Sequence, residues 1–321
     1  MTPVPNPSPN ADDTFQLGNY VVCIMDLLGQ KEKLKDWDTL PADGKITPAI
    51  TAGLKATIGA VEGFYRAFTD YFETQRAATR FSALSLSLMN AADRELYLRQ
   101  KEFELGVQQF SDTFVFYAPL VNSRSELGVL PVHAILGACS MAMLLSLGAK
   151  IPLRGAVHIG TGIKLPELSF YGPALAEAHR LECHVAQYPR VVVSPSLVGF
   201  VQHKPSSTGS PLVDGWFAEM LKVCQNMLAV DGFDNQPIVD WLGEGFRKLM
   251  GSSMEPQIYQ ALHNAHEFVG QTAQAFQQRF ESSKSASDEK LFKRYDVLYE
   301  YLRIRLPDWG IKFQEPNADK P

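Results

Sequence analysis

The sequence predicts an α+β fold whose sheet contains strands of both directions. A continuous apolar run at residues 20–29 is typical of a buried strand. Residues 108–117 predict a β-hairpin, because apolar and aromatic residues flank a central Ser-Asp pair. Strand and helix patterns alternate from Tyr20 to about Gly199, in an order that requires a mixed sheet.

The other elements of this region follow from the spacing of apolar residues. Residues 48–76 have apolar side chains three and four positions apart, which predicts a long amphipathic helix. Residues 131–148 are apolar on nearly all sides, which predicts a buried helix. We further expect a loop or short helix at 31–43, a strand at 153–162, a turn at 170–173, a helix at 174–182 and a short strand at 190–193.

The C-terminal part of the chain has a different composition. A Ser/Thr/Gly-rich segment at 206–209 marks a candidate boundary. Beyond it, the apolar spacing predicts four helices, at 216–227, 237–250, 257–280 and 288–305. The prediction is therefore a tail at 1–14, a domain at 15–205 and a helical C-terminal extension at 206–321.

Composition excludes several classes of function. The chain has 321 residues, of which 45% are hydrophobic and 20% charged, as is usual for a globular protein with a sizeable core. The net charge of −5 provides no basic field for nucleic acid or a membrane surface, so any phosphate site must be local. The four cysteines form no Cys-x-x-Cys pair, which favours reduced thiols and disfavours zinc.

The sequence also predicts a cytoplasmic location. The first 13 residues are rich in Pro, Asn and Ser, which predicts a disordered tail and not a signal peptide. No apolar run is long and charge-free enough to span a bilayer; residues 136–147 come closest, and at that length they predict a buried helix.

Two aspartates end predicted strand segments. Asp26 closes the first strand, and Asp112 lies at the tip of the hairpin. If the first strand lies beside the hairpin, the two carboxylates meet at one edge of the sheet, where they repel unless divalent cations lie between them. Two cations with oxygen ligands can hold a triphosphate. Residues 27–30 follow as a turn that contains Gly29, and backbone N–H groups there, ahead of a helix, suit a phosphate.

Four motifs occur in the order found in class III nucleotidyl cyclases. They are Asp26 at the end of a strand, Phe-Ser-Asp112 in a hairpin, Leu-Arg154-Gly-Ala-Val-His158-Ile-Gly160, and Tyr171-Gly172-Pro-Ala-Leu-Ala-Glu-Ala-His-Arg180-Leu-Glu182. The chain resembles this family over roughly residues 20–193. The resemblance implies a ferredoxin-like palm: a mixed, mainly antiparallel sheet with helices on one face. It also implies closure of a nucleoside triphosphate to a 3′,5′-cyclic monophosphate and pyrophosphate, in a homodimer with sites at the interface.

The resemblance assigns roles to individual residues. It implies that Asp26 and Asp112 bind two Mg²⁺ or Mn²⁺ ions, with the carbonyl oxygen of Leu27 as a further ligand. Arg180, supplied by the partner chain, would meet the charge on the α-phosphate. The expected contacts to the other phosphates are Leu28, Gly29 and Arg190.

Three positions depart from the purine cyclases of this family. Ala176 replaces an asparagine that contacts the ribose. The two base-recognition positions hold Gln108 and Ser169, which match neither the adenine nor the guanine code. A glutamine amide both donates and accepts hydrogen bonds, which suits a pyrimidine edge. The chain therefore resembles the bacterial Pycsar anti-phage cyclases, which make cyclic UMP or cyclic CMP that acts on a separate effector protein. This favours UTP as substrate and leaves CTP open.

Simpler interpretations exist for the same residues. Asp112 alone is an ordinary turn residue, Arg180 an ordinary surface arginine, and Arg190 an ordinary residue at a strand end. Gln108 and Ser169 are polar residues at strand ends, which need no function. Two alternative functions also remain: a purine cyclase with an unusual pocket, and a catalytically silent cyclase-like domain that binds a nucleotide, which the loss of the asparagine at Ala176 supports.

Overall fold

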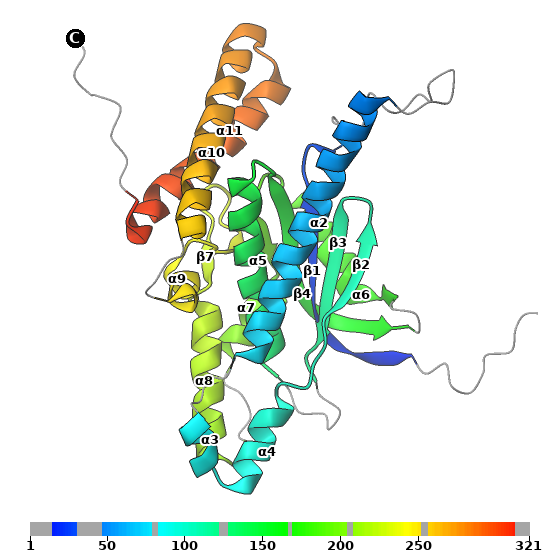
Figure 1. Ribbon diagram of the computed structural model, residues 1–321, viewed down its shortest axis with the longest axis vertical. Helices are drawn as coiled ribbons and strands as arrows, with labels where there is room; N and C mark the ends of the chain where they lie inside the picture. Colours follow the sequence, from blue (N-terminus) through cyan, green and yellow to red (C-terminus); the bar gives the residue numbers. More distant parts are fainter. Residues whose placement is uncertain are drawn as a thin grey trace, which may run out of the picture.

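The computed structural model describes residues 15–30, 47–78, 83–121, 128–165, 169–203, 208–251 and 256–311 (Figure 1). The tail expected at 1–14 and the loop expected at 31–43 lie outside these ranges.

One mixed sheet organises the described part of the chain. Its strands are β1 (Gln16–Leu27), β2 (Gly106–Phe110), β3 (Thr113–Pro119), β4 (Leu153–Lys164), β5 (Phe170–Tyr171), β6 (Val191–Val193), β7 (Leu228–Val230) and β8 (Pro237–Val239). The order is β2-β3-β1-β4-β6-β8-β7, and β5 pairs with β4. Only the β4–β6 pair is parallel among these strands. The sheet is therefore mixed and mainly antiparallel, as predicted.

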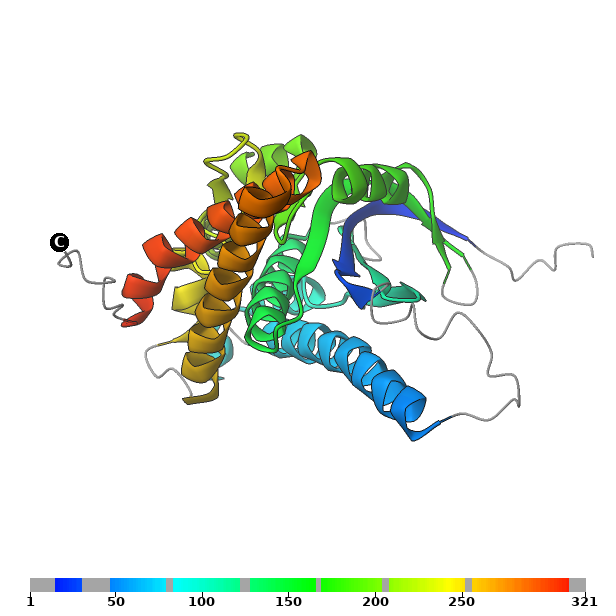
Figure 2. The same cartoon turned by 90° about the horizontal axis from the view of Figure 1, so that it is seen from above.

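Helices lie on both faces of this sheet. The described helices are α2 (Pro48–Ala77), α3 (Ala83–Leu88), α4 (Ala91–Arg99), α5 (Leu130–Gly148), α6 (Pro173–His184), α7 (Pro195–Gln202), α8 (Pro211–Gln225), α9 (Glu244–Met250), α10 (Pro256–Ser283) and α11 (Ala286–Arg305), followed by a 3₁₀ turn at Leu306–Trp309. Figure 2 shows α2 and α5 below the sheet and α6 above it. The expected helical layer on one face is formed by α2 and α5, and α6 adds a cover on the other face.

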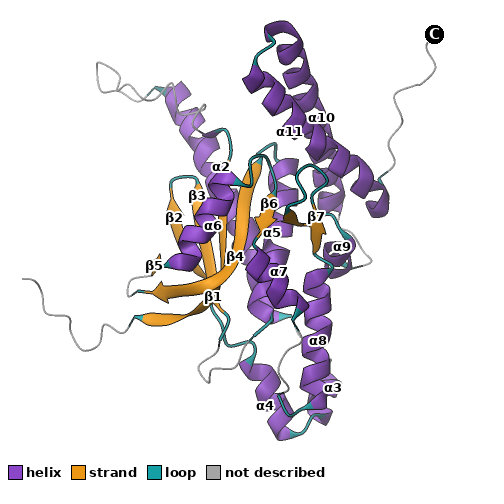
Figure 3. Cartoon of the chain, turned by 180° about the vertical axis from the view of Figure 1, so that it is seen from behind, coloured by secondary structure: helices purple, strands orange, loops and turns teal. Residues whose placement is uncertain are grey.

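This double cover explains why β1 is apolar at consecutive positions. Successive side chains of a strand point to opposite faces. Val21, Cys23 and Met25 belong to the large core formed with α2 and α5. Val22 and Ile24 join the smaller core under α6 (Figure 3). A strand that is buried on both faces cannot show the apolar–polar alternation of a half-exposed strand.

The buried helix predicted near residues 131–148 is α5. By length and composition it is the one described helix able to cross a membrane, but 94% of its apolar window is buried inside the protein. Its sides pack against α2, α10 and α8, so neighbouring helices explain its all-round apolar composition.

The C-terminal part adds strands as well as helices. The predicted helices at 216–227, 257–280 and 288–305 correspond to α8, α10 and α11. The helix predicted at 237–250 is wrong in its first part, because Pro237–Val239 forms β8 and the helix begins only at Glu244. The β-branched Ile238 pairs with Val192 of β6, so pairing across the sheet overrides the local helical spacing.

Candidate functional site

Asp26 and Asp112 lie at the same edge of the sheet. The antiparallel pairing of β1 and β3 places Asp26 opposite Thr113, the residue that follows Asp112. The backbone N–H of Leu27 donates to the carbonyl oxygen of Asp112 at 3.2 Å. Two residues that are 86 positions apart in the chain are thereby brought together, as the sequence predicts.

A two-residue turn presents Asp112. Ser111 adopts a φ of 61°, a positive value at the first loop position that is typical of the tight turns of hairpins. The side-chain amide of Gln109 donates to the carbonyl oxygen of Ser111 at 2.8 Å. The turn thus stays compact and places Asp112 next to the end of β1.

The carboxylate of Asp26 has two further contacts. The hydroxyl of Thr113 donates to Oδ1 at 2.6 Å, and Nη2 of Arg154 lies 3.4 Å from Oδ2. Arg154 is itself held by Glu182 of α6, at 2.6 Å. Burial is the main cause that raises the pKa of Asp26; the charges of Glu182 and Asp112 add to the rise, whereas Thr113 and Arg154 oppose it.

These oxygens fit a hard divalent cation. Carboxylate and carbonyl oxygens are the ligands that Mg²⁺ and Mn²⁺ prefer, and Mg²⁺ usually keeps several waters beside one or two protein carboxylates. The candidate metal ligands at this edge are the carboxylate oxygens of Asp26 and Asp112 and the carbonyl oxygen of Leu27. Among the described residues, the guanidinium group of Arg154 opposes a cation beside Asp26, although Glu182 already compensates part of its charge.

Arg180 is an exposed residue of α6. Gly172, with a φ of 127° that favours glycine, leads into Pro173, which begins α6. The helix turns Ala174 and Ala178 toward the sheet, and the side chain of Arg180 is 53% exposed. Arg180 donates two hydrogen bonds to Glu177, at 2.7 and 2.8 Å.

The two predicted base-recognition positions are neighbours. In the amide orientation that satisfies both of its polar atoms, Gln108 of β2 donates to the carbonyl oxygen of Phe170 at 3.3 Å and accepts from its N–H at 2.8 Å. Ser169 directly precedes Phe170, and its carbonyl oxygen accepts from the N–H of Leu165 at 2.8 Å. The amide of Gln108 therefore fastens β5 to β2 in this structure.

Leu28 and Gly29, two of the predicted phosphate contacts, differ in whether their backbone is open to a ligand. The N–H of Leu28 donates to the carbonyl oxygen of Pro152 at 2.9 Å, so this N–H is not available to a phosphate. Gly29 is exposed and has a φ of 84°. A side chain at Gly29 would meet nothing within 4 Å, so the backbone there is open to a ligand.

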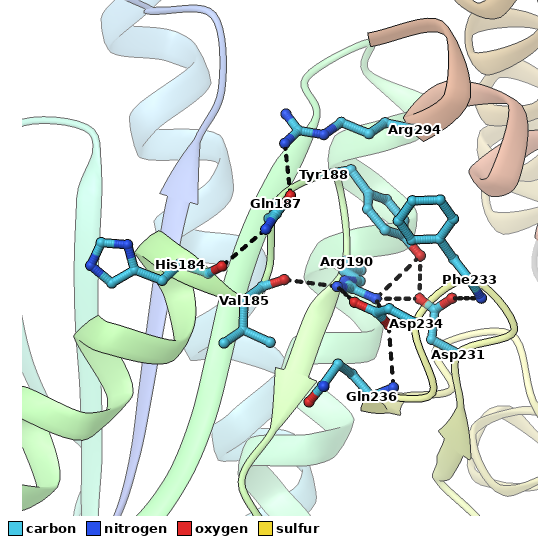
Figure 4. A network of polar contacts seen from close by, with 10 residues as sticks. All are labelled: His184, Val185, Gln187, Tyr188, Arg190, Asp231, Phe233, Asp234, Gln236 and Arg294. Atoms are coloured by element: carbon cyan, nitrogen blue, oxygen red, sulfur yellow. Dashed lines mark hydrogen bonds and ion pairs between the residues drawn. The ribbon is translucent and has the colours of Figure 1, made fainter. Parts of the chain in front are cut away.

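Arg190 does not act as a free phosphate-binding cation. Figure 4 shows its guanidinium group inside a buried network with the β7–β8 loop. It donates to Asp231 at 2.7 Å, to Asp234 at 2.8 and 2.5 Å, and to the carbonyl oxygen of Val185 at 2.7 Å. Two carboxylates already balance its charge, so the expected role in binding phosphates is corrected to a structural one. No local pattern reveals this, because the two aspartates lie more than 40 residues later in the chain.

A second polar cluster lies on α6 and was not predicted. His179, Glu182 and Cys183 place one ligand atom each within 4.8 Å of one another. The thiol of Cys183 donates to Oε2 of Glu182 at 3.0 Å. Burial and then this carboxylate raise the pKa of Cys183 to about 11. The thiol is therefore protonated at neutral pH, and a metal ion in this cluster would have to displace that proton.

Comparison with known proteins gives distant matches only. No protein-family profile matches the sequence, and no curated protein matches it. One similar solved structure is the catalytic core of a rhodopsin-guanylyl cyclase with converted specificity in complex with ATPαS, at 8% identity and a TM-score of 0.37, covering 59% of this chain and 84% of that one. Another is a bacterial light-regulated adenylyl cyclase, at 11% identity and a TM-score of 0.37; the match covers 80% of this chain and 58% of that one. Because the sequence identities and TM-scores are this low, the function must be inferred from the residues of this chain.

Proposed function

We propose that the chain is a metal-dependent nucleotide cyclase that converts UTP or CTP to the 3′,5′-cyclic monophosphate and pyrophosphate. The observation that carries this proposal is the placement of Asp26 and Asp112 at one edge of the sheet, where the N–H of Leu27 bonds to the Asp112 backbone. An oxygen-lined site of this kind suits the two Mg²⁺ or Mn²⁺ ions that bind a triphosphate.

The residues around the aspartates have separate roles. Asp26 and Asp112 would hold the divalent ions, which supply charge neutralisation and lower the pKa of the attacking ribose hydroxyl. Thr113 and Arg154 keep the carboxylate of Asp26 in one orientation. Gly29, with its open backbone, is the proposed contact to the phosphates.

The proposed enzyme is a homodimer with its sites at the interface. Among the described residues, the exposed side chain of Arg180 pairs with Glu177 and with neither aspartate of its own chain, which supports a role in the site of a partner subunit. Its pairing with Glu177 is a weak, solvent-exposed i,i+3 ion pair, which a phosphate can displace. The planar guanidinium group then meets the charge that develops on the α-phosphate.

The preference for a pyrimidine depends on Gln108 and Ser169. Gln108 contacts Phe170, the neighbour of Ser169, so the two positions lie close together. A base read by Gln108 would replace the bonds of its amide to the Phe170 backbone. The resemblance to Pycsar cyclases supports the remaining parts of the proposal: a cytoplasmic enzyme of anti-phage defence whose cyclic nucleotide acts on a separate effector protein. Neither a nucleic acid nor a membrane takes part.

One observation favours a second candidate, a catalytically silent domain that binds a nucleotide. Arg154 places a cation 3.4 Å from the Asp26 carboxylate, where it competes with a metal ion. Ala176 also lacks the amide that would hold a ribose. Nucleotide binding without turnover is the result that selects this candidate.

Incubation of the purified protein with each of the four nucleoside triphosphates and Mn²⁺ tests the proposal. We expect cyclic UMP or cyclic CMP as the main product, and loss of turnover in Asp26→Asn and in Asp112→Asn. Asp70→Asn, an exposed position on α2, is the matched control that keeps wild-type activity. A dominant cyclic purine product contradicts the pyrimidine assignment, and no cyclic product of any kind contradicts the enzyme.

A further inference from the structure

The N-terminal half of α11 carries cations that the proposed mechanism does not use. Lys290, Lys293 and Arg294 line a pocket with Gln187 and Phe233. The pocket lies where α11 approaches the loop between α6 and β6, and Figure 4 shows Arg294 extending over Gln187. Lys293 is balanced by Glu289 at 2.7 Å, whereas no ion pair within the described ranges involves Lys290.

Arg294 is a half-buried arginine that lacks a carboxylate partner. It donates one hydrogen bond, from Nη2 to the side-chain oxygen of Gln187 at 3.1 Å. In the described residues no carboxylate lies within ion-pair distance of it, whereas Arg154 contacts Glu182 and Arg190 contacts Asp234. Burial, followed by the positive charges of Arg154 and Arg190, lowers the pKa of Arg294. A bound anion would offset both the burial of the guanidinium group and the repulsion from the two other arginines, because it compensates a charge that is partly removed from water.

The positive charge of Arg294 can be related to the aspartate edge through Arg154. Arg154, whose charge acts on Arg294, lies 3.4 Å from the carboxylate of Asp26. Arg154 thus contacts Asp26, and its positive charge also acts on Arg294. Arg190, the residue expected to hold the terminal phosphates, is neutralised by Asp231 and Asp234 and cannot fill that role.

We propose that Arg294, assisted by Lys290, is the site that binds the polyphosphate tail of the nucleotide and the pyrophosphate product. The assignment to a nucleotide rests on the proposed function; the anion site itself does not. Gln187 occupies one N–H of the guanidinium group and leaves others to form paired hydrogen bonds to phosphate oxygens. The C-terminal extension would then supply part of the substrate site.

Calorimetric titration of the metal-free protein with pyrophosphate tests the anion site directly. We expect Arg294→Gln to weaken pyrophosphate binding about tenfold, since a charged hydrogen-bond donor is lost. Arg294→Lys keeps the charge without the planar fork and should give an intermediate affinity. Arg303→Gln is the matched control, because Arg303 is a 57% exposed arginine on the same helix that pairs with Glu300.

Steady-state kinetics tests the assignment to the nucleotide. In Arg294→Gln we expect a KM for the accepted triphosphate that is about tenfold higher, with a smaller change in kcat, and pyrophosphate should compete with the triphosphate. If Arg294→Gln has the same affinity for pyrophosphate and the same KM as Arg303→Gln, the proposal is overturned, even when the enzyme is active. Pyrophosphate that binds through Arg294 without competing overturns the nucleotide assignment. Pyrophosphate binding by a protein that forms no cyclic product contradicts the proposed function alone.

Discussion

Thr113 has a role at the residue scale that its position next to Asp112 does not reveal. Its hydroxyl donates to the carboxylate of Asp26 at 2.6 Å, across the β1–β3 pair. Side chains that hydrogen-bond to metal-ligating carboxylates orient them, and their loss lowers metal affinity. Thr113 is therefore a positioning residue for the proposed cation site.

We predict that Thr113→Val weakens Mn²⁺ binding by about tenfold or more, because valine keeps the shape of threonine but donates no hydrogen bond to Asp26. Titration with Mn²⁺, followed by electron paramagnetic resonance, measures this effect. Thr113→Ser retains the hydroxyl and serves as the control. Equal affinities of the valine and serine variants would show that the bond does not support the site.

The reactivity of Cys183 gives a second prediction. Its thiol, with a pKa raised to about 11, should react slowly with iodoacetamide at pH 8, because the thiolate is the reactive form. Glu182→Gln removes the negative charge beside the sulfur atom and should accelerate alkylation. Mass spectrometry of the alkylated peptide measures the rate, and the buried Cys23, Cys139 and Cys224 should stay unmodified in the folded protein. A rate that is equal in both proteins contradicts the assigned cause.

At the scale of elements, glycine decides how closely β2 approaches its neighbours. Gly106 lies opposite Tyr117 in the β2–β3 pair, and a Cβ atom at Gly106 would overlap the tyrosine ring. That ring cannot move aside easily, because it stacks on Phe170 with centroids 4.4 Å apart.

We expect Gly106→Ala to destabilise the protein by about 1–3 kcal/mol, the usual effect of overpacking a filled core. Gly59→Ala is the matched control: Gly59 lies within α2, and an added Cβ meets nothing within 4 Å. This control should stabilise by about 0.5–1 kcal/mol, because alanine is the better helix former. Urea unfolding of both variants measures the difference, and a neutral Gly106→Ala variant would contradict the steric argument.

At the scale of the whole molecule, one core joins the two predicted parts. α10 packs against α5, and β8 continues the sheet from β6. Val213, Leu262 and Leu302 belong to the same core as Val21 and Leu136. A boundary near residue 205 therefore divides the sequence by composition but does not divide the hydrophobic core. We infer that residues 15–205 need the C-terminal extension to bury α5.

The network of Arg190 ties these parts together electrostatically and makes stability depend on pH. The hydrogen bond from Arg190 is the largest cause that lowers the pKa of Asp234. A carboxylate whose pKa is lower in the folded state stabilises the protein above the unfolded pKa of about 3.9 and loses this effect as pH falls through the folded value.

We therefore predict that Asp234→Asn lowers the free energy of unfolding at pH 7 and has a smaller effect at pH 3, where part of the wild-type carboxylate is also protonated. Urea unfolding of both proteins at the two pH values gives the comparison. Asp296→Asn, an exposed position on α11, is the control and should change little at either pH. An equal loss at both pH values would mean that the charge of Asp234 does not stabilise the fold.

The sequence by itself determined the main elements and the pairing of the aspartates. Apolar spacing located β1, the β2–β3 hairpin, α2, α5 and α6, because burial on a helix or strand face imposes a repeat that is readable locally. The positions of Asp26 and Asp112 followed from where two strands end. The roles of Gln108 and Ser169 at a base stay predictions, and the bond from Gln108 to Phe170 was not foreseen.

Only the tertiary structure decided the partners of the charged side chains and the path of the C-terminal part. Arg190 meets Asp231 and Asp234, and Arg154 meets Glu182, through contacts between residues far apart in the chain. The strand β8 forms where a helix was predicted, because pairing with β6 offers hydrogen bonds that local spacing does not encode. Long-range pairing and desolvation determine whether an arginine is neutralised in the core, like Arg190, or left to bind an anion, as we propose for Arg294. Both depend on the assembled chain and not on its local pattern.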